Sequence, residues 1–375
     1  MAPIKLGFIG LSAQGWAKAA HYPYLKNSPD YKIVALQNSS VQSSEAAIKS
    51  LGLDEETKAY GNSEEIGKDP NVELVVCSVR CHLHAPSIRP ALKAGKDVYV
   101  EWPLARTLKE AEELLALKNA SGVKNAYVGL QDRQLPAIQK IKSVIKSGKL
   151  GKVLSSTFVG YGHHQGPTTT EDFEVFGNRK LGGNLLTIHF GHALDYIQYA
   201  LGEGFKTAPK TTLANRRPTI ALVNKDGSVI NPASPTTAEE TIFLQGTLSS
   251  DVPISIAFRG GEPFKGTPAL DWRIYFEKGE IRLTTPFFFL GQGLNVKLEL
   301  HDFASDTVEE LVVDADRFET TQFPGANIAR VYQGIKDAKE GKEGIYSEAL
   351  VSWEVAVDRH RIIEAMYREN GIVEE

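Results

Sequence analysis

The sequence predicts a two-domain protein, with a doubly wound parallel α/β domain followed by an α+β domain that has a large, mostly antiparallel, open-faced sheet. Residues 4–130 alternate short apolar runs with helical segments, the pattern of a parallel sheet covered on both faces. After Leu150 the apolar segments alternate with polar residues and are separated by turns, which is typical of antiparallel strands. We therefore expect a nucleotide-binding domain at 1–130 and a substrate and dimerisation domain at 131–375.

The first apolar run leads into a glycine-containing turn. Ile4–Phe8 alternate as in a buried strand, Gly10 and Gly15 bound the turn, and Trp16 starts a helical segment. A helix N-terminus after such a turn offers unpaired N–H groups and a partial positive charge to a pyrophosphate. In the G-x-G-x-x-G fingerprint the middle position is Ser12, whose small side chain can donate to a phosphate oxygen. The turn predicts an NAD(P)-binding Rossmann domain, the alternative being an ordinary strand–helix turn without a ligand.

The second strand, Tyr31–Leu36, bears on the choice of cofactor. Domains that prefer NAD usually carry Asp or Glu at its end, where it binds the ribose hydroxyls. Here Gln37, Asn38, Ser39 and Ser40 follow, with no acid and no arginine. Neutral side chains do not repel a 2′-phosphate, so we expect NADP or NAD, with a slight preference for NADP.

The rest of the first domain reads as a regular alternation. The expected elements are a helix at Ser43–Leu51 stopped by Gly52, a strand at Lys58–Tyr60, a helix capped by Ser63, a strand at Val72–Val79, a helix at Pro86–Ala94, a strand at Lys96–Val100, a helix at Leu108–Asn119 capped by Thr107, and a strand at Asn125–Leu130. In open parallel sheets ligands bind at the carboxyl ends of the strands.

The second domain is expected to combine strands with three helices. The expected strands are Val153–Tyr161, Thr211–Leu213, Thr241–Leu248, Val252–Arg259, Trp272–Phe276, Glu280–Thr284 and Val296–Leu300, and the helices lie near Asn184–Leu201, Ile328–Ala338 and Glu348–Glu369. Asn231–Thr237, rich in Pro, Ser and Thr, is expected to be a loop. An open sheet face on a chain of this size suggests a homodimer through that face.

Composition limits the partners and the compartment. The 375 residues include 42% hydrophobic and 23% charged residues with a formal net charge of −4, which gives no footprint for nucleic acid or an anionic membrane. We expect no signal peptide and no membrane span. Cys77 and Cys81 alone fit a reducing cytosol, so we expect a cytoplasmic protein without a metal site.

Several motifs together resemble one enzyme family. They are the turn GLSAQG, HAPSIRPALKAGKDVYVEWP, GLQDRQLPAIQKIKSVIKSGKLGKV, GGNLLTIHFGHALD and the terminal EAMYRENG. The chain is similar nearly end to end to the glucose–fructose oxidoreductase / inositol dehydrogenase (Gfo/Idh/MocA) family. Gly15-Trp16-Ala17, His21-Tyr22-Pro23 and Glu101-Trp102 are most similar to a fungal branch that includes the galactose-pathway repressor.

The resemblance also shows two departures at the expected active site. The family's Glu-Lys-Pro motif supplies a lysine near the nicotinamide, but Trp102 stands in its place and cannot transfer a proton. We expect Trp102 to stack on a flat ring, to wall off the pocket, or simply to pack. The family's Asp-His-Asp motif corresponds to Thr187, His192 and Asp195, with one extra residue before the histidine.

The candidate site residues follow from the motifs and from the resemblance. The catalytic candidates are His192, His189, Tyr161 and Lys180, since a histidine near its ordinary pKa can transfer the proton that accompanies hydride transfer. The cofactor-binding candidates are Gly10, Ser12, Ala13, Gln14, Gly15, Trp16, Asn38, Ser39, Ser40, Val79, Arg80, His84, Glu101, Trp102 and Gln131. The resemblance implies that His84 lies near the ribose and that Glu101 holds the nicotinamide end. The substrate-pocket candidates are Trp102, His163, His164, Arg179 and Asp195.

Two functions from different classes remain open on the sequence. The first is an NAD(P)-dependent oxidoreductase acting on a hydroxyl or carbonyl substrate, either sugar-like or a secondary metabolite. The second is a catalytically inactive regulatory protein that senses NAD(P), similar to the galactose-pathway repressor. Non-redox chemistry with a retained cofactor is a third possibility, because fold alone does not decide function.

Overall fold

The computed structural model describes residues 2–162, 164–290 and 295–373, which fall into two compact units. The first unit comprises Met1–Gln134 and Asp316–His360, and the second comprises Leu135–Ala315 and Arg361–Glu375. The chain thus returns to its first unit after the second has been built. We call residues 316–360 the return segment. The single division near residue 130 that the sequence predicts assigns this segment to the second domain.

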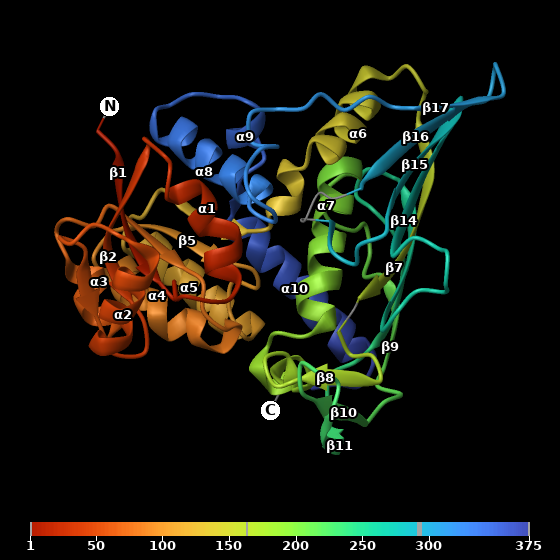
Figure 1. Cartoon of the computed structure of the whole chain (residues 1–375). Coiled ribbons are helices and arrows are strands. Elements are labelled where there is room, and N and C mark those ends of the chain that lie inside the picture. Colours follow the sequence, from red (N-terminus) through yellow and green to blue (C-terminus); the bar gives the residue numbers. More distant parts are fainter. Residues whose placement is uncertain (1, 163, 291–294, 374–375) are drawn as a thin grey trace. The chain divides into compact units, whose positions relative to one another are not determined.

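The first unit is built on a seven-stranded sheet with the order β18-β6-β5-β4-β1-β2-β3 (Figure 1). Its strands are β1 (Ile4–Ile9), β2 (Tyr31–Gln37), β3 (Lys58–Tyr60), β4 (Leu74–Cys77), β5 (Asp97–Glu101), β6 (Ala126–Gly129) and β18 (Val351–Ser352). All neighbours are parallel except β18, which pairs antiparallel with β6. The six parallel strands confirm the predicted doubly wound sheet, and their order places the reversal between β1 and β4.

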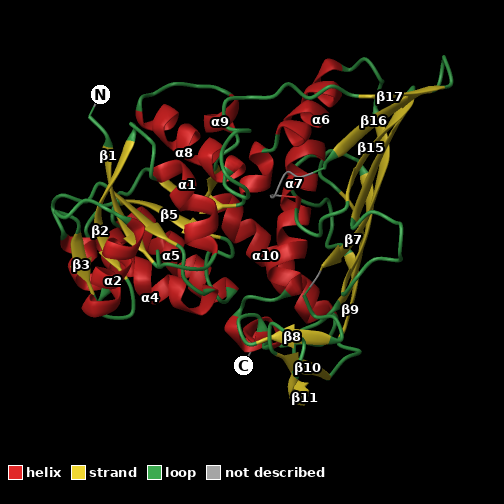
Figure 2. Ribbon diagram, in the orientation of Figure 1, coloured by secondary structure: helices red, strands yellow, loops and turns green. Residues whose placement is uncertain are grey.

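Helices cover both faces of this sheet (Figure 2). They are η1 (Ala17–His21), α1 (Tyr22–Leu25), α2 (Val41–Leu51), α3 (Ser63–Lys68), α4 (His84–Lys93), α5 (Leu108–Ala120), α8 (Ala326–Lys339), α9 (Ile345–Glu348) and the first part of α10 (Trp353–Glu369). On one face, Leu6, Phe8 and Leu74 of the strands share a core with Ile328 and Val331 of α8. Apolar burial against α8 therefore holds the return segment in this unit.

Local hydrogen bonds move several predicted helix ends. α2 begins two residues early because Ser40 and Ser43 form a capping box. The cap of α3 is Asn62 and not Ser63, since the Asn62 side chain accepts from the Glu65 N–H at 3.1 Å. Thr107 caps α5 as predicted. The helix expected at 348–369 is interrupted, because α9, β18 and α10 share that stretch.

The second unit contains an eight-stranded sheet with the order β17-β16-β15-β14-β7-β13-β12-β9. The strands are β7 (Val153–Gly162), β9 (Lys210–Ala214), β12 (Thr241–Thr247), β13 (Pro253–Gly260), β14 (Leu270–Phe276), β15 (Gly279–Thr285), β16 (Lys297–Asp302) and β17 (Thr307–Glu310). Its strands are antiparallel except for the parallel pair β7–β13. The predicted large, mostly antiparallel sheet is confirmed.

A smaller sheet corrects one prediction. Its strands are β8 (Thr168–Thr170), β10 (Thr219–Val223) and β11 (Val229–Pro235), in the order β11-β10-β8. The sequence predicts a loop at Asn231–Thr237, but most of this stretch belongs to β11. As an edge strand, β11 tolerates Pro232 and Pro235 because their missing N–H groups need not serve a second neighbour.

The large sheet has one covered and one open face. On the covered face Phe158 and Trp272 pack against Tyr196 of α7 (Gly191–Leu201), which runs along the sheet in Figure 1. On the open face Val159, Phe243 and Tyr275 are 39%, 49% and 43% exposed. The alternation along β7 places successive side chains on opposite faces, as the sequence predicts.

Among the described residues, none of the helices combines the length and the apolar character that crossing a lipid bilayer requires.

Candidate functional site

The glycine turn after β1 has a shape that only glycine permits at its first position. Gly10 has φ +93°, and a Cβ there would lie 2.5 Å from the Ser78 carbonyl oxygen at the end of β4. Gly15 has φ +88° and open space around it. The Ser12 hydroxyl donates to the Gln14 carbonyl oxygen at 2.8 Å, so Ser12 closes the turn from within. The turn retains the shape of a pyrophosphate cradle although its middle glycine is absent.

The end of β2 is neutral, as the sequence shows. Asn38 donates from its amide nitrogen to the Leu11 carbonyl oxygen at 2.9 Å, which ties β2 to the glycine turn. The Ser40 hydroxyl is engaged in the cap of α2, whereas Ser39 is exposed beside that helix N-terminus. A helix N-terminus favours a negative group.

His84 links two loops at the carboxyl edge of the sheet. Its Nδ1 lies 2.8 Å from the Pro103 carbonyl oxygen and its Nε2 lies 3.0 Å from the Val79 carbonyl oxygen. Burial lowers the pKa of His84, and the two carbonyls partly offset this effect. His84 therefore stabilises the loops that follow β4 and β5. The neighbouring Arg80 is exposed.

Glu101 is the last residue of β5, and Gln131 lies two residues after the end of the neighbouring strand β6. Glu101 pairs in register with Gly129, and a Cβ on Gly129 would lie 2.9 Å from the Glu101 Oε2. Gln131 is buried, and its Oε1 has no hydrogen-bond partner within the described part of the chain. A shaped glycine turn and an unpaired buried acceptor at the same sheet edge fit a bound dinucleotide.

We expect Gly129→Ala to weaken dinucleotide binding by about tenfold, since the new methyl group displaces the Glu101 carboxylate and costs roughly one hydrogen bond to a charged group. The measurement is calorimetric titration of the variant with NADH and NADPH. Gly344→Ala is the matched control, because Gly344 has open space where the methyl group would lie. Equal affinities for Gly129→Ala and the wild type would contradict the placement of Glu101 in the cofactor site.

Trp102 is buried in the first unit, next to an aromatic ring of α10. It is 5% exposed, and its ring centroid lies 4.9 Å from that of His360 on α10. Burial lowers the pKa of His360 to about 3, and the nearby His84 acts in the same direction. His360 is therefore neutral near physiological pH. Nothing in the sequence around His360 indicates this contact.

In the second unit the helix carrying the family's Asp-His-Asp positions begins with a π-helical turn. Residues Leu185–Phe190 form η6, which continues into α7. Asn184 and Thr187 form its capping box, because each side chain accepts from the other's backbone N–H, at 3.0 and 2.9 Å. A π-helical turn accommodates one more residue than an α-helical turn without ending the helix, so η6 runs directly into α7. Thr187 thus serves in the cap of this helix.

Three histidines of the second unit, which we call the histidine cluster, lie among phenylalanine rings. They are His164, His189 and His192. The rings of His164 and His189 are 5.1 Å apart, and those of His192 and Phe289 are 4.9 Å apart. The ring centroid of Phe288 lies 5.6 Å from that of His189 and 5.8 Å from that of His164. His189 and His192 are buried. The structure therefore brings together three of the predicted site residues. His163 lies outside the described residues.

The other candidates of the second unit lie elsewhere. Tyr161 belongs to the open face of the sheet, where the Arg259 guanidinium lies 4.4 Å from its ring centroid. Arg179 donates to the Glu239 carboxylate at 2.6 Å, and burial raises the pKa of Glu239 while Arg179 partly opposes this. Lys180 is exposed and Asp195 is buried in α7. The described residues contain no group of three or more His, Cys, Asp or Glu able to hold a metal ion.

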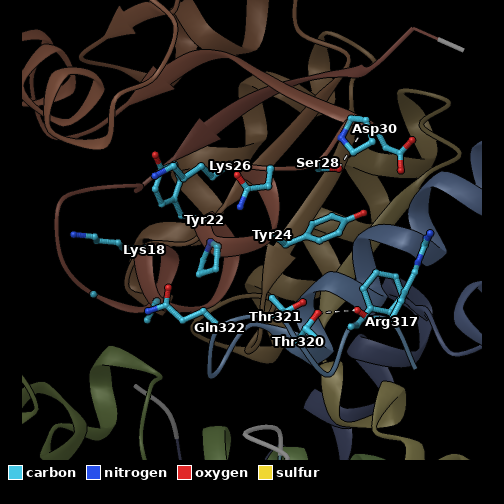
Figure 3. Close-up of a pocket in the computed structure, with 16 residues that line it drawn as sticks. Lys18, Tyr22, Tyr24, Lys26, Ser28, Asp30, Arg317, Thr320, Thr321 and Gln322 are labelled. Atoms are coloured by element: carbon cyan, nitrogen blue, oxygen red, sulfur yellow. Dashed lines mark hydrogen bonds between the residues drawn. The ribbon is translucent and has the colours of Figure 1, made fainter. Parts of the chain in front are cut away.

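A hollow of about 910 Å³ lies on the first unit (Figure 3). It is lined by one side of the η1–α1 helix, including Lys18, Tyr22 and Lys26, and by the segment around Arg317. Gly15 is the one residue of its lining that was predicted to bind the cofactor. The hollow is therefore mostly separate from the predicted cofactor residues.

Comparison with known proteins agrees with the resemblance. Residues 4–130 match the model of the oxidoreductase family with an NAD-binding Rossmann fold, and residues 136–285 match that of the Gal80p C-terminal domain. The chain is 32% identical to the dehydrogenase aclE of Aspergillus oryzae, covering 97% of this chain and 95% of that protein. It is 28% identical to the galactose/lactose metabolism regulatory protein GAL80 of Saccharomyces cerevisiae, covering 98% and 93%.

A solved structure extends the similarity to the fold. A super-repressor mutant of Gal80p from Saccharomyces cerevisiae superimposes with a TM-score of 0.89 at 27% identity, covering 99% of this chain and 96% of that chain. The glycine turn, the strand order of the first sheet and the full-length similarity all indicate the same family. The chain belongs to the Gfo/Idh/MocA oxidoreductase family.

Proposed function

We propose that the chain is an NAD(P)-dependent oxidoreductase that interconverts a hydroxyl and a carbonyl group of a small molecule, sugar-like or a secondary metabolite. The observation that supports this most is the histidine cluster, in which the imidazoles of His189 and His192 are buried. The dehydrogenase aclE supports it through its full-length similarity.

The residues divide the work as follows. The glycine turn would hold the pyrophosphate, and Glu101 and Gln131 would meet the nicotinamide end. When bound, the nicotinamide donates or accepts the hydride. His192 would give or take the proton of the substrate oxygen, with His189 as the second candidate. The phenylalanine rings beside both histidines would exclude water. Lys180 and Tyr161 are weaker candidates, because Lys180 is exposed and Tyr161 lies on the open face of the large sheet.

The neutral end of β2 supports the use of NADP as well as NAD, with a slight preference for NADP. The open face of the large sheet, with Val159, Phe243 and Tyr275 exposed, supports a homodimer through this face.

The main test is a two-step experiment on the purified chain. Titration with NADH and NADPH, followed by protein fluorescence, measures binding. Hydride transfer is then assayed at 340 nm over a panel of sugars, polyols and carbonyl compounds with both cofactors. We expect binding and turnover of at least one compound. Absence of binding to either cofactor would contradict the proposal.

A second candidate is a regulatory protein that binds NAD(P) without catalysis. The full-length similarity to GAL80 favours it, as does Trp102 at the position where the resemblance implies a lysine. Cofactor binding, no turnover of any panel compound, and no thermal stabilisation of the cofactor complex by those compounds would support this function over the enzyme.

A further inference from the structure

A chain of buried hydrogen bonds reaches Glu101 from two other elements of the first unit. His21 is the last residue of η1 and is completely buried. Its Nε2 lies 2.9 Å from the Glu101 Oε1, and its Nδ1 lies 2.9 Å from the hydroxyl of Tyr332 on α8. Tyr99 of β5 donates to the same Glu101 oxygen at 3.1 Å. The network joins residues that lie far apart in the sequence.

The Glu101 carboxylate, at one end of this hydrogen-bond network, fixes the direction of the hydrogen bonds. A carboxylate oxygen accepts, so His21 donates from Nε2 to Glu101. In the neutral ring Nδ1 then accepts from the Tyr332 hydroxyl. Burial raises the pKa of both Tyr332 and Tyr99 well above 10, so both phenols remain donors.

The bonds leave one Glu101 oxygen for a ligand. His21 and Tyr99 both contact Oε1, and no hydrogen bond from the described residues reaches Oε2. Gly129, which has no side chain, lies beside the carboxylate group, and a Cβ there would lie 2.9 Å from Oε2 and 3.0 Å from Oε1. The ribose hydroxyls and the carboxamide NH₂ of a nicotinamide nucleotide are donors that such an oxygen can accept.

Packing alone does not explain a histidine at this position. The His21 ring lies among the rings of Phe8, Tyr99 and Tyr332, at centroid distances of 5.4 to 5.8 Å. An apolar side chain would fill this space without the cost of burying two ring nitrogens. The two hydrogen bonds of His21 offset this cost, and they also fix the orientation of the groups that they join.

We propose that His21 and Tyr332 are positioning residues that hold the Glu101 carboxylate so that Oε2 meets the nicotinamide end of the dinucleotide. This rests on the proposed binding of NAD(P) but not on catalysis. ADP-ribose separates the two ends of the cofactor, because it has the adenine and the pyrophosphate but not the nicotinamide.

The test measures the affinity of variants for NAD⁺ and for ADP-ribose by calorimetry. Tyr332→Phe removes only the hydroxyl, and we expect about fivefold weaker NAD⁺ binding with ADP-ribose affinity within twofold. His21→Leu should weaken NAD⁺ binding about tenfold or more, and His21→Gln, whose amide can donate to Glu101, should recover part of this. Tyr31→Phe is the matched control. The buried Tyr31 hydroxyl donates at 2.6 Å to the Tyr332 backbone carbonyl, and it takes no part in the hydrogen-bond network that reaches Glu101.

Each other outcome overturns the inference. Equal losses of NAD⁺ and ADP-ribose affinity would indicate a purely structural role, and unchanged NAD⁺ affinity in Tyr332→Phe and His21→Leu would show that the network is irrelevant to binding. The same holds if Tyr31→Phe behaves as Tyr332→Phe does. Wild-type protein that binds neither NAD⁺ nor NADP⁺ would remove the proposed function itself, and wild-type protein that binds NAD⁺ no more tightly than ADP-ribose would remove only the role of Glu101.

Discussion

His192→Asn is expected to lower kcat by about 10²–10⁴-fold and to leave the affinity for NAD(P) within about twofold. Asparagine retains polarity at this buried position of α7 but cannot transfer a proton near neutral pH. The loss should appear in kcat more than in KM, because the missing group acts in the transition state. Steady-state kinetics on the substrate found in the panel, with calorimetric titration of the cofactor, measure both quantities.

The control for this substitution is His301→Asn. His301 belongs to β16 of the same unit, is partly exposed and pairs with Asp306 at 2.9 Å, so its loss should leave kcat unchanged. Activity of His192→Asn within threefold of the wild type would exclude His192 as the proton-transfer group. His189→Asn would then be the next variant, since His189 belongs to the same histidine cluster.

The first unit was the more predictable part of the fold because its signals are local. Each buried parallel strand is a short apolar run, as in Leu74–Cys77, and each run is followed by a helix. The glycine turn could be recognised for the same reason, since Gly10 and Gly15 are required by the backbone within six residues. In the second domain the alternation along β7 and β14 identified the strands but not their order.

The return segment could not be predicted because its signals are not local. Nothing within 316–360 indicates that α8 packs on β1 and β2 instead of on the preceding sheet, and β18 is only two residues long. The contact of His21 with Glu101 and Tyr332 joins three distant stretches in the same way. The family resemblance singled out Glu101, whereas its contacts with His21 and Tyr332 became visible only in the folded chain.

The helix that carries the histidine cluster illustrates an intermediate case. The sequence predicts a helix at 184–201 and, by the resemblance, one extra residue before His192. It does not predict that this helix begins with the π-helical turn η6, because propensities do not distinguish this form from an α-helix. The capping role of Thr187 became visible only through its hydrogen bond from the Asn184 N–H.

Removal of Arg330 is expected to destabilise the first unit by about 3 kcal/mol. Arg330 lies on α8 two residues before Tyr332 and is 1% exposed. Its guanidinium donates to both oxygens of Asp316, at 2.7 and 2.9 Å, and to Glu319 and Asn327. Arg330→Met would leave the Asp316 carboxylate partly buried without its partner. The measurement is urea unfolding followed by tryptophan fluorescence, and we expect a lower midpoint with an unchanged slope.

Arg89→Met is the matched control for this variant. Arg89 pairs with Glu113 at 2.7 Å, but both side chains are exposed, and surface pairs of this kind contribute about 0–1 kcal/mol. A loss for Arg330→Met no larger than for Arg89→Met would contradict a stabilising role for the buried hydrogen bonds of Arg330.

The effect of Arg330 should also depend on pH in a direction set by Asp316. Burial alone would raise the pKa of Asp316, but the hydrogen bonds and the charge of Arg330, with the Tyr346 hydroxyl, outweigh it and hold this pKa below 3.8. A carboxyl group whose pKa is lower in the folded state stabilises the fold above its unfolded pKa and loses this contribution as the pH falls through the folded value. The difference in unfolding free energy between wild type and Arg330→Met should therefore be full at pH 6 and should shrink below about pH 4. A difference that stays constant from pH 6 to pH 3, measured by urea unfolding at each pH, would show that Arg330 acts through packing and not through its ion pair with Asp316.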